Sequence, residues 1–303
     1  MTSPAATGSR TALVLPGQGS QRPGAGAAWR RFPAWSLVDQ AGGLLGRDCA
    51  HLLLTADADE LRATAQAQLA TYLMSLVVWR SLPPLDVVVV AGHSLGELTA
   101  LVVAGVLTPE AGLLLVAERG AAMQQAADAA PGAMAAVLGL SDEVVAEVCA
   151  AIEGVWPANS NAPSHLVISG TIEGVAAAGL ALREAGARRV LPLPVGGAFH
   201  TPLMAPARSR LEVALRAAAY APARVPVLSA VTVREHGPDV AGLLSQQLTA
   251  PVRWREVLEA LPARGVDRVV ELGPGGVLAG LVKRTLPGMV VQSVAAPDDL
   301  ARL

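Results

Sequence analysis

Residues 87–98 read Val87-Val88-Val89-Val90-Ala91-Gly92-His93-Ser94-Leu95-Gly96-Glu97-Leu98, and this stretch decides the fold. Four consecutive valines are typical of a strand buried on both faces, and Gly-His-Ser-Leu-Gly ends the run before a helical segment begins. In this setting Gly-x-Ser-x-Gly is typical of a nucleophile elbow, whose glycines leave room for a strained turn. We therefore expect Ser94 to be a nucleophile, and the N–H of Leu95, at the start of the helix, to stabilise an oxyanion. The alternative is an ordinary glycine turn whose serine does no chemistry.

The length and charge of the chain limit what it can be. Its 303 residues suffice for one large domain, or for a large domain with a smaller one inserted. The formal net charge of −2 gives no indication of binding to nucleic acid or to an anionic membrane. The longest apolar runs are too short to span a bilayer, and Met1 to Arg10 lacks the apolar segment of a secretory signal. Cys49 and Cys149 have no metal-ligand spacing, so we expect reduced thiols, a cytoplasmic protein and no metal site.

A glycine-rich loop follows the first predicted strand. The strand covers Thr11 to Leu15, and the loop reads Pro16-Gly17-Gln18-Gly19-Ser20-Gln21. The loop lacks the Gly-Lys-Ser/Thr ending of a P-loop and the third glycine of a dinucleotide fingerprint, so we expect no nucleotide site. Loops at the carboxyl ends of strands in open α/β sheets bind ligands, and Gln18 can approach a site at the strand that carries Ser94. A plain turn is the alternative.

Helices are predicted on both sides of the elbow in the sequence. Asp57 to Leu82 carries leucines at helical spacing, and Asp57 or Asp59 is expected to cap its start. A later helix begins at about Pro109 and contains Arg119 among apolar residues. Such an arginine is either a surface residue with a buried stem or a cation directed into a cavity, where it would bind a carboxylate through two hydrogen bonds.

The character of the sequence changes from Pro131. Short β-like runs alternate there with helical segments, which predicts an inserted α+β subdomain; the runs are 133–138, 166–169 and 189–193, and the helices are 141–152 and 172–185. Asn159, Asn161 and His165 fall between these elements, and we expect them to be turn formers on loops rather than ligands. Strands and helices alternate again after the inserted segment, so the chain returns to an α/β domain.

A serine nucleophile requires a base, and two histidines are candidates. His93 directly precedes Ser94, so on a sharp elbow its side chain should point away from the serine and line the pocket. His200 lies between Gly196-Gly197 and Pro202, on a constrained loop that suits a base held in one orientation, although a buried structural histidine would have the same sequence context. No carboxylate between Ser94 and His200 follows a core strand, as the third member of an esterase triad would. The group that holds His200 is therefore expected to be neutral, for example a backbone carbonyl.

These motifs together resemble the malonyl-CoA:acyl-carrier-protein transacylase family over nearly the whole chain. The matching segments are Gly17-Gln18-Gly19-Ser20-Gln21, Gly92-His93-Ser94-Leu95-Gly96-Glu97, Glu118-Arg119-Gly120 with Met123, Asn161-Ala162-Pro163, Phe199-His200-Thr201-Pro202-Leu203-Met204, Gln247-Leu248, Pro251-Val252-Arg253-Trp254 and Glu271-Leu272-Gly273-Pro274-Gly275. The resemblance implies a large α/β-hydrolase-like domain with a mostly parallel sheet over residues 1–128 and 197–303. It implies a small ferredoxin-like α+β subdomain over residues 129–196. Gln68-Leu69-Ala70 departs from the family's usual Gln-Pro-Ala, which affects the subfamily rather than the chemistry.

The same resemblance assigns roles to individual residues. Ser94 would be acylated, His200 would act as general base and then as general acid, and the main-chain carbonyl of Gln247 would hold His200. The oxyanion hole would come from the backbone of Gln18 and Leu95, and Arg119 would bind the free carboxylate of a malonyl group. Further residues of the substrate pocket would be His93, Met123 and Phe199. Phe199 and Leu95 match relatives that select unsubstituted malonyl.

The implied reaction is ping-pong transfer of malonyl from malonyl-CoA to the phosphopantetheine thiol of an acyl carrier protein. The enzyme would bind no cofactor of its own, act as a monomer and contact neither nucleic acid nor membrane. Because such carrier proteins are acidic, we expect a basic patch near the site, for which Arg189, Lys283 and Arg284 are candidates; ordinary solvated charges are the alternative.

Three other functions remain open at this stage. An acyl hydrolase of the same fold would release acyl groups to water, but such relatives tend to lose the arginine that Arg119 matches. A malonate decarboxylase transacylase subunit would share the substrate, although it tends to differ at the position of His93. A docking module without catalysis is disfavoured by the intact set of Ser94, His200 and Arg119.

Overall fold

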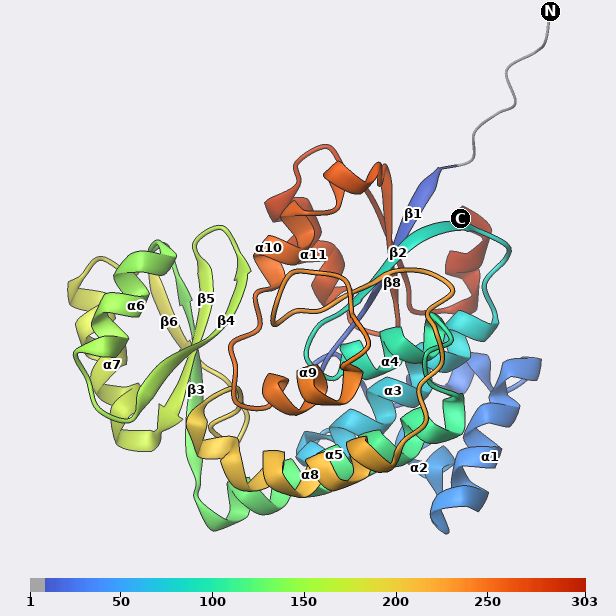
Figure 1. The fold of residues 1–303 in the computed structure, drawn as a ribbon, viewed down its shortest axis with the longest axis horizontal. Coiled ribbons are helices and arrows are strands. Elements are labelled where there is room, and N and C mark those ends of the chain that lie inside the picture. The colour runs from blue at the N-terminus through green and yellow to red at the C-terminus, as the bar shows by residue number, and fades with distance from the viewer. Residues whose placement is uncertain (1–8) are drawn as a thin grey trace, which may run out of the picture.

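Five parallel strands form the central sheet of the computed structural model, which describes residues 9–303 (Figure 1). In spatial order they are β7 (Val227–Leu228), β2 (Asp86–Gly92), β1 (Arg10–Leu15), β8 (Arg268–Leu272) and β9 (Val290–Val294). The expectation about a secretory signal falls largely on residues 1–8, outside the described part. None of the helices formed by residues 9–303 combines the length and apolarity needed to cross a bilayer.

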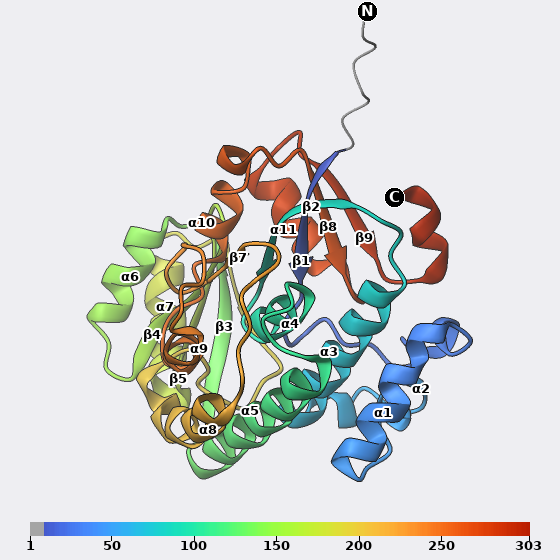
Figure 2. The ribbon, with the colours of Figure 1, turned by 45° about the vertical axis from the view of Figure 1, so that its right-hand side comes forward.

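Both faces of this sheet are covered by helices, which is why its strands are almost continuously apolar. Along β1, Leu13 and Leu15 belong to one hydrophobic core and Ala12 and Val14 to another on the opposite face. The first core includes residues of α1 (Ser36–Leu45), α2 (Cys49–Leu54), α3 (Thr64–Arg80), α4 (Gly96–Val103), α5 (Pro109–Ala129), α8 (Ala205–Ala217) and α9 (Val240–Gln247). The second includes residues of α10 (Trp254–Glu259) and α11 (Val277–Thr285). In Figure 2, α10 and α11 of the second group lie above α3, α4 and α5 of the first.

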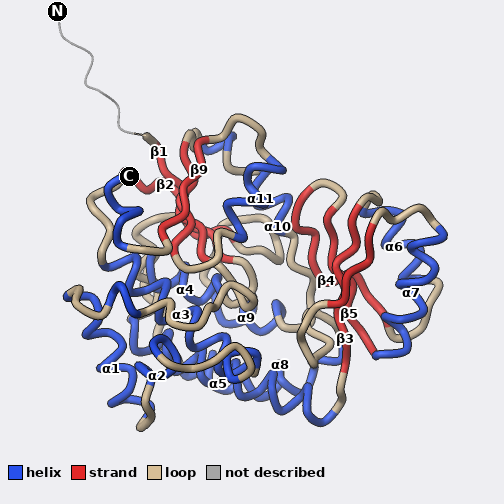
Figure 3. The backbone as a smooth tube through the Cα atoms, turned by 180° about the vertical axis from the view of Figure 1, so that it is seen from behind, coloured by secondary structure: helices blue, strands red, loops and turns tan. Residues whose placement is uncertain are grey.

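A second, antiparallel sheet lies beside the first (Figure 3). Its order is β4 (Val155–Ala162), β5 (His165–Thr171), β3 (Gly132–Leu138) and β6 (Arg189–Pro192), and it packs against α6 (Asp142–Ala150) and α7 (Ile172–Glu184). Side chains alternate across a strand, so along β3 Ala135 and Val137 join the core under α6 and α7. Met134 and Ala136 point the other way and line a cavity between the two sheets.

Two local expectations were wrong. Asn159 and Asn161 lie on β4 rather than on a loop, and His165 is the first residue of β5. The edge of β4 is completed by Val252, whose N–H donates to Ala158 O at 2.8 Å and whose carbonyl accepts from Ser160 N at 2.9 Å. Because that partner lies about ninety residues away in sequence, the low strand propensity of this segment misled the local prediction.

The helix expected from Asp57 begins only at Thr64. Asp57 Oδ1 accepts hydrogen bonds from Asp59 N and Glu60 N, at 2.9 and 2.8 Å, beside a separate 3₁₀ turn over Glu60–Arg62 whose N-cap residue is Asp59. Ala63 then adopts extended backbone angles, with ψ of 131°, before α3 starts. The expected cap was therefore also wrong, because Ala63, whose side chain cannot cap, stands at the N-cap of α3.

Candidate active site

The turn between β2 and α4 is a strained elbow that only small residues allow. Ser94 has a φ of 54°, in the left-handed region that non-glycine residues rarely adopt. A Cβ on Gly92 would lie 1.9 Å from the carbonyl carbon of Gly96, and one on Gly96 would lie 2.0 Å from Leu15 O. The strain, on the order of 1–3 kcal/mol, is maintained by the packing around it and presents the Ser94 hydroxyl at the end of the sheet.

His200 is hydrogen-bonded to Ser94 and to a main-chain carbonyl. Its Nε2 lies 2.8 Å from Ser94 Oγ, and its Nδ1 lies 3.0 Å from Gln247 O. A carbonyl can only accept, so Nδ1 carries the proton and Nε2 is left to accept the serine proton. Burial, and next the positive charge of Arg119, lower the pKa of His200 to about 3. The imidazole is therefore neutral and ready to act as a base.

Arg119 brings a buried positive charge next to the serine. Its side chain comes from α5 and is 2% exposed. Nη1 donates to Gln68 Oε1 at 2.7 Å, and Nη2 lies 3.1 Å from both Ser94 Oγ and Gln247 Oε1. Burial lowers the pKa of Arg119 to about 10, so the guanidinium is still charged at neutral pH. Within residues 9–303 no carboxylate contacts it, which makes it suited to receive one from a ligand.

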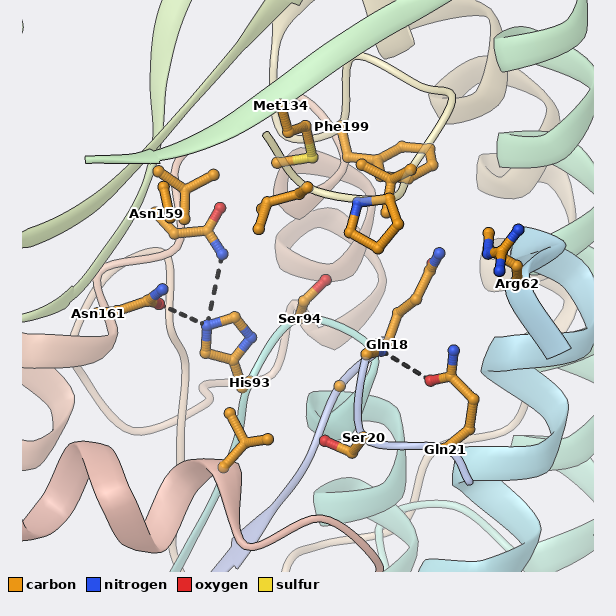
Figure 4. Close-up of a pocket in the computed structure, with 18 of the residues that line it drawn as sticks. Gln18, Ser20, Gln21, Arg62, His93, Ser94, Met134, Asn159, Asn161 and Phe199 are labelled. Carbon is orange, nitrogen blue, oxygen red and sulfur yellow. Dashed lines mark hydrogen bonds between the residues drawn. The ribbon is translucent and has the colours of Figure 1, made fainter. Parts of the chain in front are cut away.

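His93 points away from Ser94, toward the antiparallel sheet (Figure 4). Its Nε2 lies 2.9 Å from Asn161 Oδ1 and 3.4 Å from Asn159 Nδ2, and its ring meets Trp254 edge-on at 5.5 Å between centroids. Burial lowers the pKa of His93. The histidine that precedes Ser94 is thus a neutral wall of the cavity; its Nε2 can donate to Asn161, a contact that the sequence did not predict.

Two backbone amides near Ser94 have no hydrogen-bond acceptor in the described part of the chain. Among residues 9–303 neither Gln18 N nor Leu95 N donates a hydrogen bond to a protein atom. The loop that carries Gln18 lies against the elbow, since a Cβ on Gly17 would come within 2.6 Å of His93 O. Gln21 fixes this loop, because its Oε1 accepts from Gly19 N at 2.7 Å and its Nε2 donates to Leu61 O at 3.0 Å. Free N–H groups on two adjoining loops are what an oxyanion hole requires.

These groups open into a cavity of about 500 Å³ between the two sheets. The catalytic end holds Ser94, His200 and Arg119, and the walls are mainly apolar; they include Met123, Met134, Ala136, Val167, Phe199 and Leu281. Among residues 9–303 no three His, Cys, Asp or Glu side chains gather closely enough to hold a metal ion. The arrangement can therefore perform acyl transfer through a serine, on a ligand with an anionic end and an extended arm.

Comparison with known proteins identifies the family. The model of the acyl transferase domain matches residues 12–297. The chain belongs to this family. It is 39% identical to the malonyl CoA-acyl carrier protein transacylase of Bacillus subtilis, over 96% of this chain and 95% of the relative. The resemblance seen in the sequence is thereby confirmed.

Solved structures of the acyl transferase family extend the match to three dimensions. The acyl-carrier-protein S-malonyltransferase of Burkholderia pseudomallei superposes with a TM-score of 0.93 at 37% identity, covering 97% of this chain and 98% of that one. A malonyl-transacylase in complex with a type II polyketide-synthase acyl-carrier protein superposes with a TM-score of 0.93 at 36% identity, covering 97% and 98%. The predicted α/β fold with a mostly parallel sheet and a separate second sheet is confirmed.

The three basic residues expected to form a patch lie near one end of the antiparallel sheet. Arg189 on β6 and His165 on β5 are both paired with Leu138 of the strand between them. Arg284 Nη1 lies 3.5 Å from His165 Nδ1, and His165 lines the cavity. Lys283 and Arg284 are exposed in the last turn of α11, and Arg189 is exposed too. The geometry puts these charges beside the cavity; their role stays a prediction.

Three buried polar residues of the site were given no role from the sequence. Gln68 bonds Arg119, while Glu97 and His236 form a hydrogen-bonded pair behind the elbow. A role for Glu97 could have been expected, because a carboxylate in a helix that is otherwise almost entirely apolar must have a partner. His236 lies in a loop with glycine and proline neighbours, and no sequence signal links it to the elbow.

Proposed function

We propose that the chain transfers malonyl from malonyl-CoA to the phosphopantetheine thiol of an acyl carrier protein through a Ser94 acyl-enzyme. The observation that carries the proposal is the buried Arg119 guanidinium, 3.1 Å from the oxygen of a serine that is hydrogen-bonded to a neutral histidine. The site offers a nucleophile, a base and a cation for the free carboxylate of malonyl. Relatives named for this activity over nearly the whole chain support it.

The first half-reaction forms the acyl-enzyme. Nε2 of His200 takes the hydroxyl proton as Ser94 Oγ attacks the thioester carbonyl. The N–H groups of Gln18 and Leu95 stabilise the oxyanion of the tetrahedral intermediate. The carbon–sulfur bond then breaks, and the departing CoA sulfur receives the proton from His200. Gln247 O keeps the imidazolium oriented in place of a triad carboxylate.

The second half-reaction repeats these steps with a different thiol. The phosphopantetheine thiol of the carrier protein gives its proton to His200 and attacks the malonyl ester, and Ser94 leaves with the proton. The arm would enter by the same apolar cavity that CoA had left, which also disfavours water as an acceptor. Arg189, Lys283 and Arg284, beside the cavity, would attract the acidic carrier protein.

Selection of the acyl group would lie at the closed end of the cavity. Arg119 would grip the carboxylate, and Phe199 and Met123, which line the same cavity, would leave little space for a branch on the malonyl carbon. Phe199 is 5% exposed and lies so close to Gly197 that a Cβ there would come within 2.4 Å of its ring. Its ring is thus held in place, which fits a preference for unsubstituted malonyl.

A finer description of the architecture accompanies this proposal. We propose a large α/β-hydrolase-like domain over residues 1–128 and 197–303 and a small ferredoxin-like subdomain over residues 129–196. The order of elements in the smaller unit, β3-α6-β4-β5-α7-β6, is the β-α-β-β-α-β order of ferredoxin-like folds and supports the second part.

The pH dependence of acylation tests whether His200 is a neutral base. With a pKa of about 3 rather than 6.5, His200 stays unprotonated in the fold, so we expect no loss of rate near pH 6.5 as the pH is lowered from 8 to 5. In the unfolded chain this histidine does take up a proton below pH 6.5. Its contribution to the free energy of unfolding therefore falls as the pH decreases from 6.5 toward 3. Stopped-flow acylation rates on protein that circular dichroism shows to be folded would check this; a midpoint near 6.5 would contradict it.

The proposed transfer itself is tested in a single turnover. Enzyme loaded from labelled malonyl-CoA and freed of CoA would be mixed with holo carrier protein, apo carrier protein or buffer. We expect the label to reach only the holo form, at least ~10-fold faster than it is released to water, because the site favours a thiol over water. Release as free malonate at one rate in all three mixtures would instead indicate the hydrolase.

A further inference from the structure

A buried, hydrogen-bonded carboxylate–imidazole pair lies directly behind the elbow. Glu97, in the first turn of α4, is 0% exposed, and its Oε1 lies 2.6 Å from Nε2 of His236, whose side chain is 3% exposed. Its Oε2 accepts hydrogen bonds from Ala230 N at 3.2 Å and from Gln247 Nε2 at 2.7 Å. Burying a carboxylate and its partner costs desolvation energy that the pair rarely recovers as stability. The groups that Glu97 contacts therefore indicate its role.

Gln247 connects this pair with the groups around Ser94. Its main-chain carbonyl accepts from His200 Nδ1, and its side-chain Oε1 accepts from Arg119 Nη2 at 3.1 Å. Its Nε2 donates to Glu97 Oε2 and, at 3.1 Å, to the main-chain carbonyl of Ser94. Two acceptors beside Nε2 fix which way the amide faces, so Oε1 must face the guanidinium. Every polar atom of the Gln247 side chain is thus engaged, and the residue is 1% exposed.

We propose that Glu97 and His236 are positioning residues for acyl transfer. Together they fix the amide of Gln247, which holds Arg119 and His200 at hydrogen-bond distance from Ser94. The inference rests on the proposed function. His236 holds one oxygen of the carboxylate so that the other faces Gln247. Because Gln247 contacts Arg119 by its side chain and His200 by its backbone, a single carboxylate orients both the group that would bind the malonyl carboxylate and the base.

The negative charge of Glu97 also acts on Arg119, in addition to its hydrogen bonds. Burial lowers the pKa of Arg119, and the negative charge of Glu97 opposes that shift. No carboxylate of residues 9–303 touches the guanidinium, so Glu97 acts on it across the Gln247 amide rather than by a direct pair. The guanidinium keeps its charge without having its donors occupied by a protein carboxylate. A substrate carboxylate can then take them.

Substitutions that separate hydrogen bonding from packing test the proposal. Glu97→Met preserves the shape but removes the acceptors. Glu97→Gln preserves an acceptor for Gln247, and its amide can donate to His236 Nε2, because His236 Nδ1 has no partner among residues 9–303 and can carry the proton. His236→Leu releases one carboxylate oxygen. His51→Leu, in the half-buried His51–Glu60 pair, is the matched control.

Two rates and the melting temperature are measured for each variant. The first is the ratio of kcat/KM for malonyl-CoA to kcat/KM for acetyl-CoA, which reports on Arg119. The second is the rate at which a fluorophosphonate labels Ser94, which reports on His200. We expect Glu97→Met to lower the malonyl preference ~10-fold and the labelling rate ~100-fold, since displacements near 1 Å have such effects. Glu97→Gln should recover most of both, and His236→Leu should lower both by roughly 3-fold to 10-fold.

One combination of results would overturn the proposal. If Glu97→Met, or His236→Leu where the former does not fold, lowers the melting temperature but keeps both rates within ~2-fold of His51→Leu, the pair only stabilises the fold. A wild-type chain that forms no malonyl-enzyme would instead refute the proposed function. The fluorophosphonate rate would still decide about positioning, because it needs only Ser94 and His200.

Discussion

Replacing His200 by alanine is expected to slow acylation of Ser94 by roughly 10³-fold to 10⁴-fold, as loss of a catalytic base does in related serine chemistry. Nε2 of His200 lies 2.8 Å from Ser94 Oγ, and among residues 9–303 no other side chain near that oxygen can accept its proton. Arg119, the other contact, is cationic and can only donate. The rate of the first turnover with malonyl-CoA would be measured in rapid-quench experiments.

The control for this variant is His51→Ala, which removes a half-buried histidine far from the serine in sequence and unconnected to it. We expect it to acylate at the wild-type rate. A folded His200→Ala protein whose acylation stayed within ~10-fold of wild type would show that the serine is activated in another way.

Replacing Arg119 by alanine is expected to change which acyl group is transferred. The kcat/KM for malonyl-CoA should fall by about 10²-fold to 10³-fold, because two charge-assisted hydrogen bonds to a carboxylate contribute roughly 3–4 kcal/mol together. Acetyl-CoA has no free carboxylate for Arg119 to bind, so acetyl transfer should persist and should compete with malonyl transfer. Steady-state rates with both thioesters would give the ratio.

Acetyl-CoA also serves as the internal control for Arg119→Ala. The substitution leaves Gln68 Oε1 and Gln247 Oε1 without their donor, which should lower the melting temperature. A general loss of stability of that kind would lower kcat/KM for malonyl-CoA and for acetyl-CoA alike. An unchanged ratio of malonyl to acetyl transfer would remove Arg119 from the role proposed for it.

Much of the fold was predictable because its signals are local. The valine run of β2, the glycines of the elbow and the apolar helix behind it lie within a few residues of one another, and each reflects a steric or burial requirement. The edge strand β4 was not predictable in this way. Pro157, Asn159 and Asn161 disfavour a strand, and they form one because β5 and the distant Val252 complete their hydrogen bonds.

Some residues of the candidate site likewise carry local sequence signals, and others do not. Ser94 stands in a local motif, and His200 lies on a constrained loop whose sequence is distinctive. The partner of the imidazole is a backbone carbonyl, which any residue could supply, so Gln247 followed only from the family resemblance. Glu97 and His236 are 139 positions apart, and nothing short of the folded chain relates them.

The hydrogen-bonded groups behind the elbow would allow the proposed reaction to proceed without a triad carboxylate. In a triad, an acid both orients the imidazole and stabilises its positive charge. Here the carbonyl of Gln247 accepts from the imidazole, and burial, followed by the charge of the neighbouring Arg119, disfavours its protonation. In the proposed reaction the base would stay neutral between steps, and a carboxylate would enter the site only with the substrate.

The most direct measurement is peptide mapping by mass spectrometry after the protein has been mixed with malonyl-CoA and quenched in acid. We expect one malonyl group, located on the peptide that contains Ser94, and none on a Ser94→Ala variant treated in the same way. A Ser94→Ala protein that still carries malonyl, or a wild-type adduct on any other residue, would contradict transfer through a Ser94 acyl-enzyme.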